Sequence, residues 1–173
     1  MREANATQRR WAGKPGAYGT GNKPTYHIVG KFGEAAVEKW LQARGLPVDS
    51  AFRDRSRAAE ADILVAGTRI EVKCWNFGTW NQGGRCVSPE QEREISDKAD
   101  IIAWCRLGRH LSPAALLDAS AASLSVHLMG FSTVAEVLAR PLEDTSFNEI
   151  PRWNHRMPES NLRDLDGLFA PRP

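Results

Sequence analysis

The sequence has few cysteines and no long apolar run. Its three cysteines, Cys74, Cys86 and Cys105, form no CxxC pair, which argues against a disulfide framework and against a zinc knuckle. No apolar stretch approaches the roughly 18 residues of a membrane span, and the N-terminus lacks the apolar segment of a signal peptide. We therefore expect a cytoplasmic protein without a membrane partner, whose thiols stay free in a reducing compartment.

Several catalytic signatures are also missing. No Walker A, GxGxxG, GxSxG or HExxH motif occurs. The histidines lie in no metal-binding spacing; they are His27, His110, His127 and His155. These absences argue against NTPase, dinucleotide-binding, α/β-hydrolase and zinc-peptidase chemistry.

The composition is that of one ordinary domain with a basic N-terminal arm. The chain has 173 residues, 42% of them hydrophobic, and a net charge of +2 from 23 basic and 21 acidic residues. Residues 1–26 are Gly-rich and basic, with Arg9 and Arg10 among the cations, which predicts a disordered arm. This arm either follows a phosphate backbone or serves as a solubilising leader. Residues 27–173 are expected to form a single domain.

Residues 61–75 contain two Ile-, Val- and Leu-rich runs on either side of Ala66-Gly67, the pattern of a β-hairpin. A two-residue loop at this point sets Asp62 opposite Glu71. Because side chains alternate along a strand, Glu71 and Lys73 share one face. The hairpin thus gathers two carboxylates and one ammonium group, although a surface hairpin with a Glu–Lys pair facing water would carry the same residues.

Asp62, followed nine positions later by Glu71-Val72-Lys73, resembles the core motif of the PD-(D/E)xK nuclease superfamily. Ala61 stands where that motif has proline, a relaxation common in the family. The resemblance implies that Asp62 and Glu71 bind a divalent metal ion together with the Val72 carbonyl, and that Lys73 activates or orients the attacking water. Oxygen ligands of this kind suit Mg²⁺ or Mn²⁺.

Residues 31–44 predict an amphipathic helix that ends with Gly45 at position C′. One stripe of this helix carries Glu34, Val37, Glu38 and Leu41. Glu34 heads an apolar stripe, an unusual place for a carboxylate. A first-turn Glu favoured by the helix dipole is one interpretation. The resemblance offers another, since the family often carries a metal-shell Glu on its first helix.

The order of the expected elements matches the αβββαβ core of the same family. A strand at residues 46–52 precedes the hairpin, and a helix capped by Ser88 and Gln91 runs to about residue 98, before a buried strand at 100–106. The expected fold class is therefore α/β. It has a restriction-endonuclease-like, Holliday-junction-resolvase-like core at about residues 30–106, in which helices flank a mixed central sheet.

The C-terminal extension, residues 107–173, carries no motif. Its pattern predicts a helix or loop at 112–117, a strand at 125–131, a helix capped by Ser132 or Thr133 through residue 139, a polar loop at 142–152, a late edge strand at 153–158 and a terminal helix at 161–169.

Two segments beside the motif are candidates for nucleic-acid contact. The polar loop before the hairpin carries Arg53, Arg55 and Arg57, which suit a phosphate clamp or a solvated connector. The Gly- and aromatic-rich segment 74–85 can stack on bases. In that segment Trp75 is assigned to packing, while Trp80 and Arg85 are the expected contacts.

Three functions remain open. The first is a metal-dependent DNA endonuclease, and the second is a nuclease-fold module that binds nucleic acid or assembles without cutting. The third is an interaction protein whose acids face water. The presence of Glu34, Asp62, Glu71 and Lys73 together favours the first. The chain also resembles small nuclease-like proteins of bacteriophages, and homodimer formation stays open.

Overall fold

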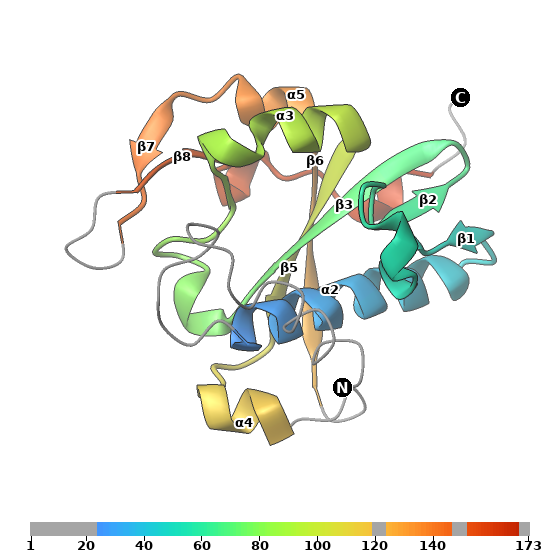
Figure 1. Cartoon of the computed structure of the whole chain (residues 1–173), viewed down its shortest axis with the longest axis horizontal. Coiled ribbons are helices and arrows are strands. Elements are labelled where there is room, and N and C mark those ends of the chain that lie inside the picture. The colour runs from blue at the N-terminus through green and yellow to red at the C-terminus, as the bar shows by residue number, and fades with distance from the viewer. Residues whose placement is uncertain (1–23, 119–123, 147–151, 170–173) are drawn as a thin grey trace.

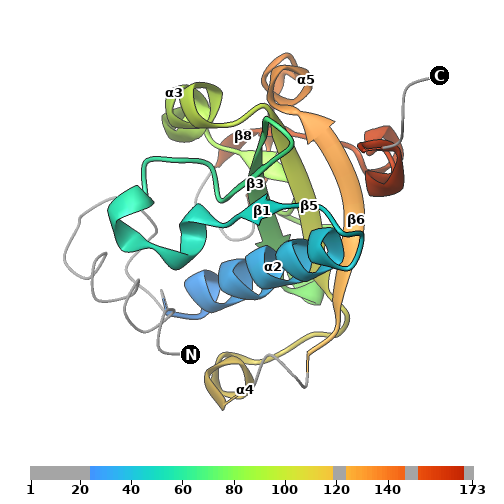
Figure 2. The same cartoon turned by 90° about the vertical axis from the view of Figure 1, so that its right-hand side faces the viewer.

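The computed structural model describes residues 24–118, 124–146 and 152–169, and shows an α/β fold with a mixed central sheet between helices. Five strands form this sheet in the order β1-β2-β3-β5-β6. They are β1 (Val48–Asp49), β2 (Ile63–Val65), β3 (Thr68–Trp75), β5 (Ile101–Leu107) and β6 (Val126–Thr133). β3 and β5 run parallel, whereas all other neighbours in the sheet are antiparallel. Helix α2 (Pro24–Gln42) covers one face, and α3 (Pro89–Lys98) and α5 (Val134–Leu138) cover the other (Figures 1 and 2).

A smaller sheet lies on the side of α3 and α5. Its three strands have the order β4-β8-β7 and are β4 (Cys86–Val87), β8 (Trp153–Arg156) and β7 (Leu142–Asp144). The remaining elements are α4 (Pro113–Asp118) and the 3-10 turns Ala51–Arg53, Arg55–Arg57, Phe77–Thr79, Glu159–Asn161 and Leu165–Gly167. No helix among the described residues is long and apolar enough to cross a membrane.

The first helix ends as its sequence predicts and begins earlier than expected. The N–H of Gly45 bonds to the carbonyl of Gln42 and the N–H of Leu46 to that of Leu41, which is the Schellman pattern with Gly45 at C′ (φ 72°). The expected start at residue 31 is wrong, because α2 already begins at Pro24. Residues 24–26 of the predicted arm are thus helical, and residues 1–23 lie outside the described part of the chain.

The hairpin has the predicted register. Val65 pairs with Thr68 and Ile63 with Ile70. Ala66 and Gly67 both have positive φ, 48° and 78°, as a type I′ turn requires. The cap of α3 is also confirmed, because the Gln91 side chain accepts a 3.4 Å hydrogen bond from the Ser88 N–H.

Two apolar layers hold the central sheet. On the α2 side, Val37 and Leu41 pack against Ile70 and Val72 of β3. On the α3 side, the buried residues include Ile95, Trp80, Ile102, Trp104 and Val137.

The C-terminal third departs most from expectation. The predicted loop at 142–152 contains strand β7, while residues 147–151 lie outside the described residues. β8 is the central strand of the small sheet rather than an edge strand, because β4 and β7 flank it. The predicted helix at 161–169 is absent from the described residues 161–169, where two short 3-10 turns and a bridge from Arg163 to Phe131 replace it. The expected first strand at 46–52 is reduced to two residues.

Gly33 has no side chain, which allows α2 to pack closely against β3. A substitution at Gly33 therefore tests this packing. A Cβ at Gly33 would lie 2.5 Å from the Cβ of Cys74, an atom that cannot rotate away. We expect Gly33→Ala to lower the free energy of unfolding by about 1–3 kcal/mol from overpacking, of which better helix propensity recovers about 1 kcal/mol at most. Urea denaturation measures the change.

The matched control is Gly167→Ala, since a Cβ there meets nothing within 4 Å. That variant should stay within about 0.5 kcal/mol of the wild type. Equal stability of both variants would contradict the close contact between α2 and β3.

Candidate metal-binding and catalytic site

The edge of β3 that faces β2 loses its strand partner after Ile70. β2 pairs only with the first three residues of β3, and no strand among the described residues takes over along residues 71–75 on this side. Instead, the Asp62 carboxylate accepts a 2.8 Å hydrogen bond from the Val72 N–H. The N–H and C=O of one strand residue point to the same edge, so the Val72 carbonyl also faces this opening.

Glu71 projects from β3 between two lysines. Its residue is only 5% exposed, with Oε1 3.1 Å from Lys73 Nζ and Oε2 2.9 Å from Lys98 Nζ. Burial alone would raise the pKa of Glu71, but the charges of Lys73 and Lys98 outweigh burial and leave the pKa below its usual value. Oε2 lacks a partner with hydrogen-bond geometry despite its short distance to Lys98.

Glu34 reaches the same region from the buried face of α2. Its Oε2 accepts a 2.5 Å hydrogen bond from Lys31 Nζ, one turn earlier on the helix. Burial raises the pKa of Glu34, and the charge of Lys31 offsets only part of that rise. The charge of Glu71 raises the pKa of Glu34 further.

Asp62 is the carboxylate that carries its charge at the greatest cost. Burial raises its pKa well above the usual value, and the nearby charges of Glu71 and Glu34 add to the rise. The hydrogen bond from Val72 and the charge of Lys98 act in the opposite direction. The structure therefore brings together Glu34, Asp62 and Glu71, as the sequence predicts, and places Lys73 beside them.

The donor chemistry of this site fits a hard divalent cation, but the side chains are not arranged as ligands. Three carboxylates and one backbone carbonyl supply only oxygen atoms, which Mg²⁺ and Mn²⁺ prefer. Glu71 Oε2 is buried and lies 2.9 Å from Lys98 Nζ, so a cation would take the place of this lysine. Within the described residues, however, no group of three Asp, Glu, His or Cys side chains could hold a metal in this conformation. Instead, Lys31 forms an ion pair with Glu34, and Lys73 and Lys98 form ion pairs with Glu71.

Two of these lysines were not expected from the sequence. Lys31 lies three residues before Glu34, and this i,i+3 spacing is a signal that could have identified it. Lys98, at the end of α3, carries no such local signal, because only the fold brings it to Glu71. Burial disfavours the charge of Lys98, yet Glu71 and Asp62 hold its pKa above the usual value.

The arginines expected to form a phosphate clamp are engaged elsewhere. Arg53 pairs with the buried carboxylate of Glu38. Arg57 binds Asp49 through two hydrogen bonds of 2.5 and 2.7 Å and also pairs with Glu60. The side chain of Arg55 lies outside the described part of the structure, as do Arg9 and Arg10. Arg53 and Arg57 therefore act as structural ties in this conformation.

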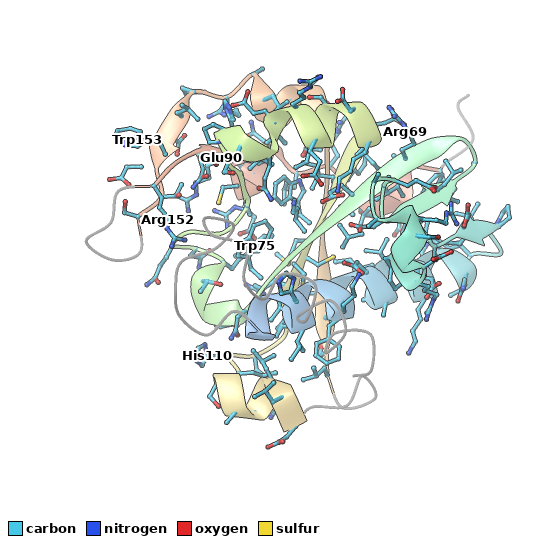
Figure 3. The ribbon with its side chains drawn as sticks, viewed as in Figure 1. Arg69, Trp75, Glu90, His110, Arg152 and Trp153 are labelled. Atoms are coloured by element: carbon cyan, nitrogen blue, oxygen red, sulfur yellow. The ribbon has the colours of Figure 1, made fainter. Side chains whose placement is uncertain are left out.

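Trp80 is not available to nucleic acid. It is 0% exposed, its Nε1 donates a 2.7 Å hydrogen bond to Glu159, and its ring meets Trp75 edge-on at 6.1 Å. Trp75 packs as expected, stacked on Trp104 at 5.6 Å. Trp153 is the more exposed ring at 57% and extends outward from β8 (Figure 3).

Arg85 is likewise buried rather than free for contact. The residue is 6% exposed and donates hydrogen bonds to the carbonyls of Met157 and Trp80. Its guanidinium lies over the Trp80 ring at 4.9 Å. The expectation of a nucleic-acid contact at Trp80 and Arg85 is therefore wrong for this conformation, because both side chains build the core next to the small sheet.

No protein-family model, curated protein or solved structure matches this chain. A function for it therefore rests on the geometry of its own residues.

Asp62→Asn tests whether the buried charge of Asp62 lowers the stability of the folded state. Because the pKa of Asp62 is raised in the folded state, that state holds the proton more tightly, and stability falls as pH rises above the usual carboxyl range. Asparagine keeps an acceptor for the Val72 N–H but cannot ionise. In EDTA the variant should melt above the wild type at pH 8, and the gain should vanish at pH values where both states are protonated.

Asp100→Asn is the matched control with the opposite sign. Hydrogen bonds from Arg69 lower the pKa of Asp100, so its charge stabilises the fold above the usual carboxyl range. That variant should melt below the wild type at pH 8. A lower melting temperature for Asp62→Asn as well would show that the charge of Asp62 is stabilising.

Proposed function

We propose that this protein is a metal-dependent nuclease that hydrolyses phosphodiester bonds, with DNA as its substrate and internal cleavage as its mode. The observation that carries the proposal is the meeting of Glu34, Asp62 and Glu71 with Lys73 at the open edge of β3. A sheet that only needed to pack would not concentrate three carboxylates where each raises the cost of charging another.

The order of the elements supports the same proposal. From α2 to β5 the chain follows helix, strand, hairpin, helix and strand, with β3 and β5 parallel. This is the order of the αβββαβ core in the PD-(D/E)xK superfamily, and we propose a restriction-endonuclease-like fold on that basis. The acidic cluster lies on the first helix and the hairpin, as the resemblance implies.

Four groups would hold the cation: the carboxylates of Asp62, Glu71 and Glu34 and the carbonyl of Val72. A Mg²⁺ or Mn²⁺ ion held there would supply a nucleophilic water at neutral pH and would neutralise charge on the phosphate. Because the pKa values of Asp62 and Glu34 are raised, protons would compete with the cation for these carboxylates, so binding should strengthen as pH rises.

Lys73 supplies the positive charge that a purely structural metal site would not need. Its Nζ lies 3.1 Å from Glu71 Oε1 and its side chain is 18% exposed, so the ammonium is held at the cluster by a side chain that is mostly buried. In this position it orients the attacking water or stabilises the developing phosphorane charge. As a further part of this proposal, the protein acts in the cytoplasm of a bacterial or phage-infected cell.

A non-cutting nuclease-fold module is the second candidate, and one observation favours it. The cluster is satisfied without a metal, since Lys31 pairs with Glu34, two lysines pair with Glu71 and the Val72 N–H bonds to Asp62. Such a network would also stabilise a module that binds nucleic acid and never cleaves it. Metal binding and cleavage separate the two candidates.

Metal binding should raise the melting temperature. A ligand at 100 times its Kd stabilises the folded state by about 2.7 kcal/mol, so saturating Mg²⁺ or Mn²⁺ should produce a clear shift that Asp62→Ala loses. Differential scanning calorimetry measures it. Asp97→Ala, which removes an exposed carboxylate on α3, should keep the shift. An unchanged wild-type melting curve in excess metal would contradict a metal site.

Lys73→Ala should abolish most cleavage while the fold and metal binding persist. A charge placed at the reacting phosphate contributes roughly 10²–10³ in rate, and this is the expected loss in single-turnover cleavage of a labelled duplex. Lys73→Gln should lose nearly as much. Lys39→Ala removes an exposed lysine from α2 and should cleave at the wild-type rate. Full cleavage by Lys73→Ala would contradict the assigned role, and a wild type that binds DNA without cutting it would favour the second candidate.

A further inference from the structure

Phe77 presents an exposed ring on an anchored turn. It is 45% exposed, whereas the other aromatic residues of the segment are partly or fully buried. The preceding Asn76 side chain donates a 2.6 Å hydrogen bond to the Leu111 carbonyl and accepts one of 3.1 Å from the Leu111 N–H. The turn that carries the exposed ring is therefore anchored to the backbone of Leu111 through Asn76.

Arg106 lies directly under this ring. Its guanidinium carbon is 4.7 Å from the centre of the Phe77 ring, which is cation–π geometry. Its Nη2 is 3.5 Å from Nδ1 of His127, a third member of what we call the Phe77 patch: Phe77, Arg106 and His127. No described carboxylate forms an ion pair with Arg106, and its Nε is a buried donor without a hydrogen bond.

Arg106 and His127 of the Phe77 patch lie on the face of the sheet that carries Glu71 and Lys73, whereas Glu34 reaches the candidate site from α2 on the other face. Residues opposite each other in a sheet point to the same face, and β3 pairs Lys73 with Trp104 and Trp75 with Arg106. Arg106 is therefore on the face of Glu71 and Lys73, opposite the position two residues beyond Lys73 and four beyond Glu71. At about 3.3 Å per residue these separations along the strand are roughly 7 and 13 Å.

We propose that the Phe77 patch binds an unpaired nucleotide of the DNA strand next to the cleaved phosphodiester, with the base stacked on Phe77 and its phosphate paired with Arg106. This inference rests on the proposed nuclease function and names the form of substrate that its site takes. An exposed ring stacks on the face of a base only where that base has left the duplex, and such stacking is indifferent to sequence. The unpaired charge of Arg106 is the complement of a backbone phosphate.

Binding in Ca²⁺ tests the proposal without turnover. Fluorescence anisotropy compares a blunt duplex with the same duplex carrying a short oligo-dT overhang. The wild type should prefer the overhang, Phe77→Ala should lose about tenfold in overhang affinity while blunt-duplex affinity stays, and Phe77→Trp should keep the preference. Arg106→Gln should flatten the salt dependence by about one phosphate contact.

Trp153→Ala is the matched control, because it removes an aromatic side chain that is also exposed (57%, against 45% for Phe77) but belongs to β8 of the small sheet. Overhang binding by Phe77→Ala and Arg106→Gln at wild-type strength and salt slope would overturn the inference, even if the wild type cleaves DNA. Overhang binding that depends on Phe77 without any cleavage would uphold the inference and overturn the nuclease. A wild type that binds no form of DNA would overturn both.

Discussion

Three carboxylates share one buried region of this protein only because positive partners meet them there. Each would be costly alone, since burial and like charge both disfavour ionisation. Lys31 forms an ion pair with Glu34 on the same helix. Lys73 from β3 and Lys98 from α3 both form ion pairs with Glu71. Burial and the charges of Glu71 and Glu34 raise the pKa of Asp62, and only the hydrogen bond from the Val72 N–H and the more distant charge of Lys98 oppose them, so its pKa rises the most clearly. The positions of α2, α3 and the hairpin relative to one another all bear on this balance.

Local chemistry explains which parts of the fold were predictable. The Ala66-Gly67 turn, the Schellman end of α2 and the cap of α3 each depend on residues within a few positions, and each is confirmed. The hairpin register then brings Asp62 and Glu71 together. For the same reason the acidic part of the candidate site was accessible from the sequence, whereas Lys98 was not, because its contact depends on how α3 packs.

The predictions that were wrong concern features that depend on residues far apart in the chain. Trp80 and Arg85 lie in a segment whose glycines and aromatics look adaptable, yet a second sheet built from distant residues closes over them. The sequence predicts β8 as an edge strand, because its neighbours β4 and β7 are only two and three residues long and give little signal of their own. The terminal leucines have helical spacing, but the bridge from Arg163 to Phe131 draws that segment toward the central sheet instead. Tertiary pairing overrides local pattern in each case.

The parallel pairing of β3 with β5 has a consequence for how the protein folds. Parallel neighbours need a crossover, here provided by α3, so their contacts join residues distant in the chain and form late compared with the hairpin. Asp62 and Glu71 approach each other as soon as the hairpin closes, but Lys98 reaches Glu71 only when the crossover docks. Lys73 lies on the same strand as Glu71 and is available to it from the start, so the packing of α3 adds only the second of the two lysine partners of Glu71.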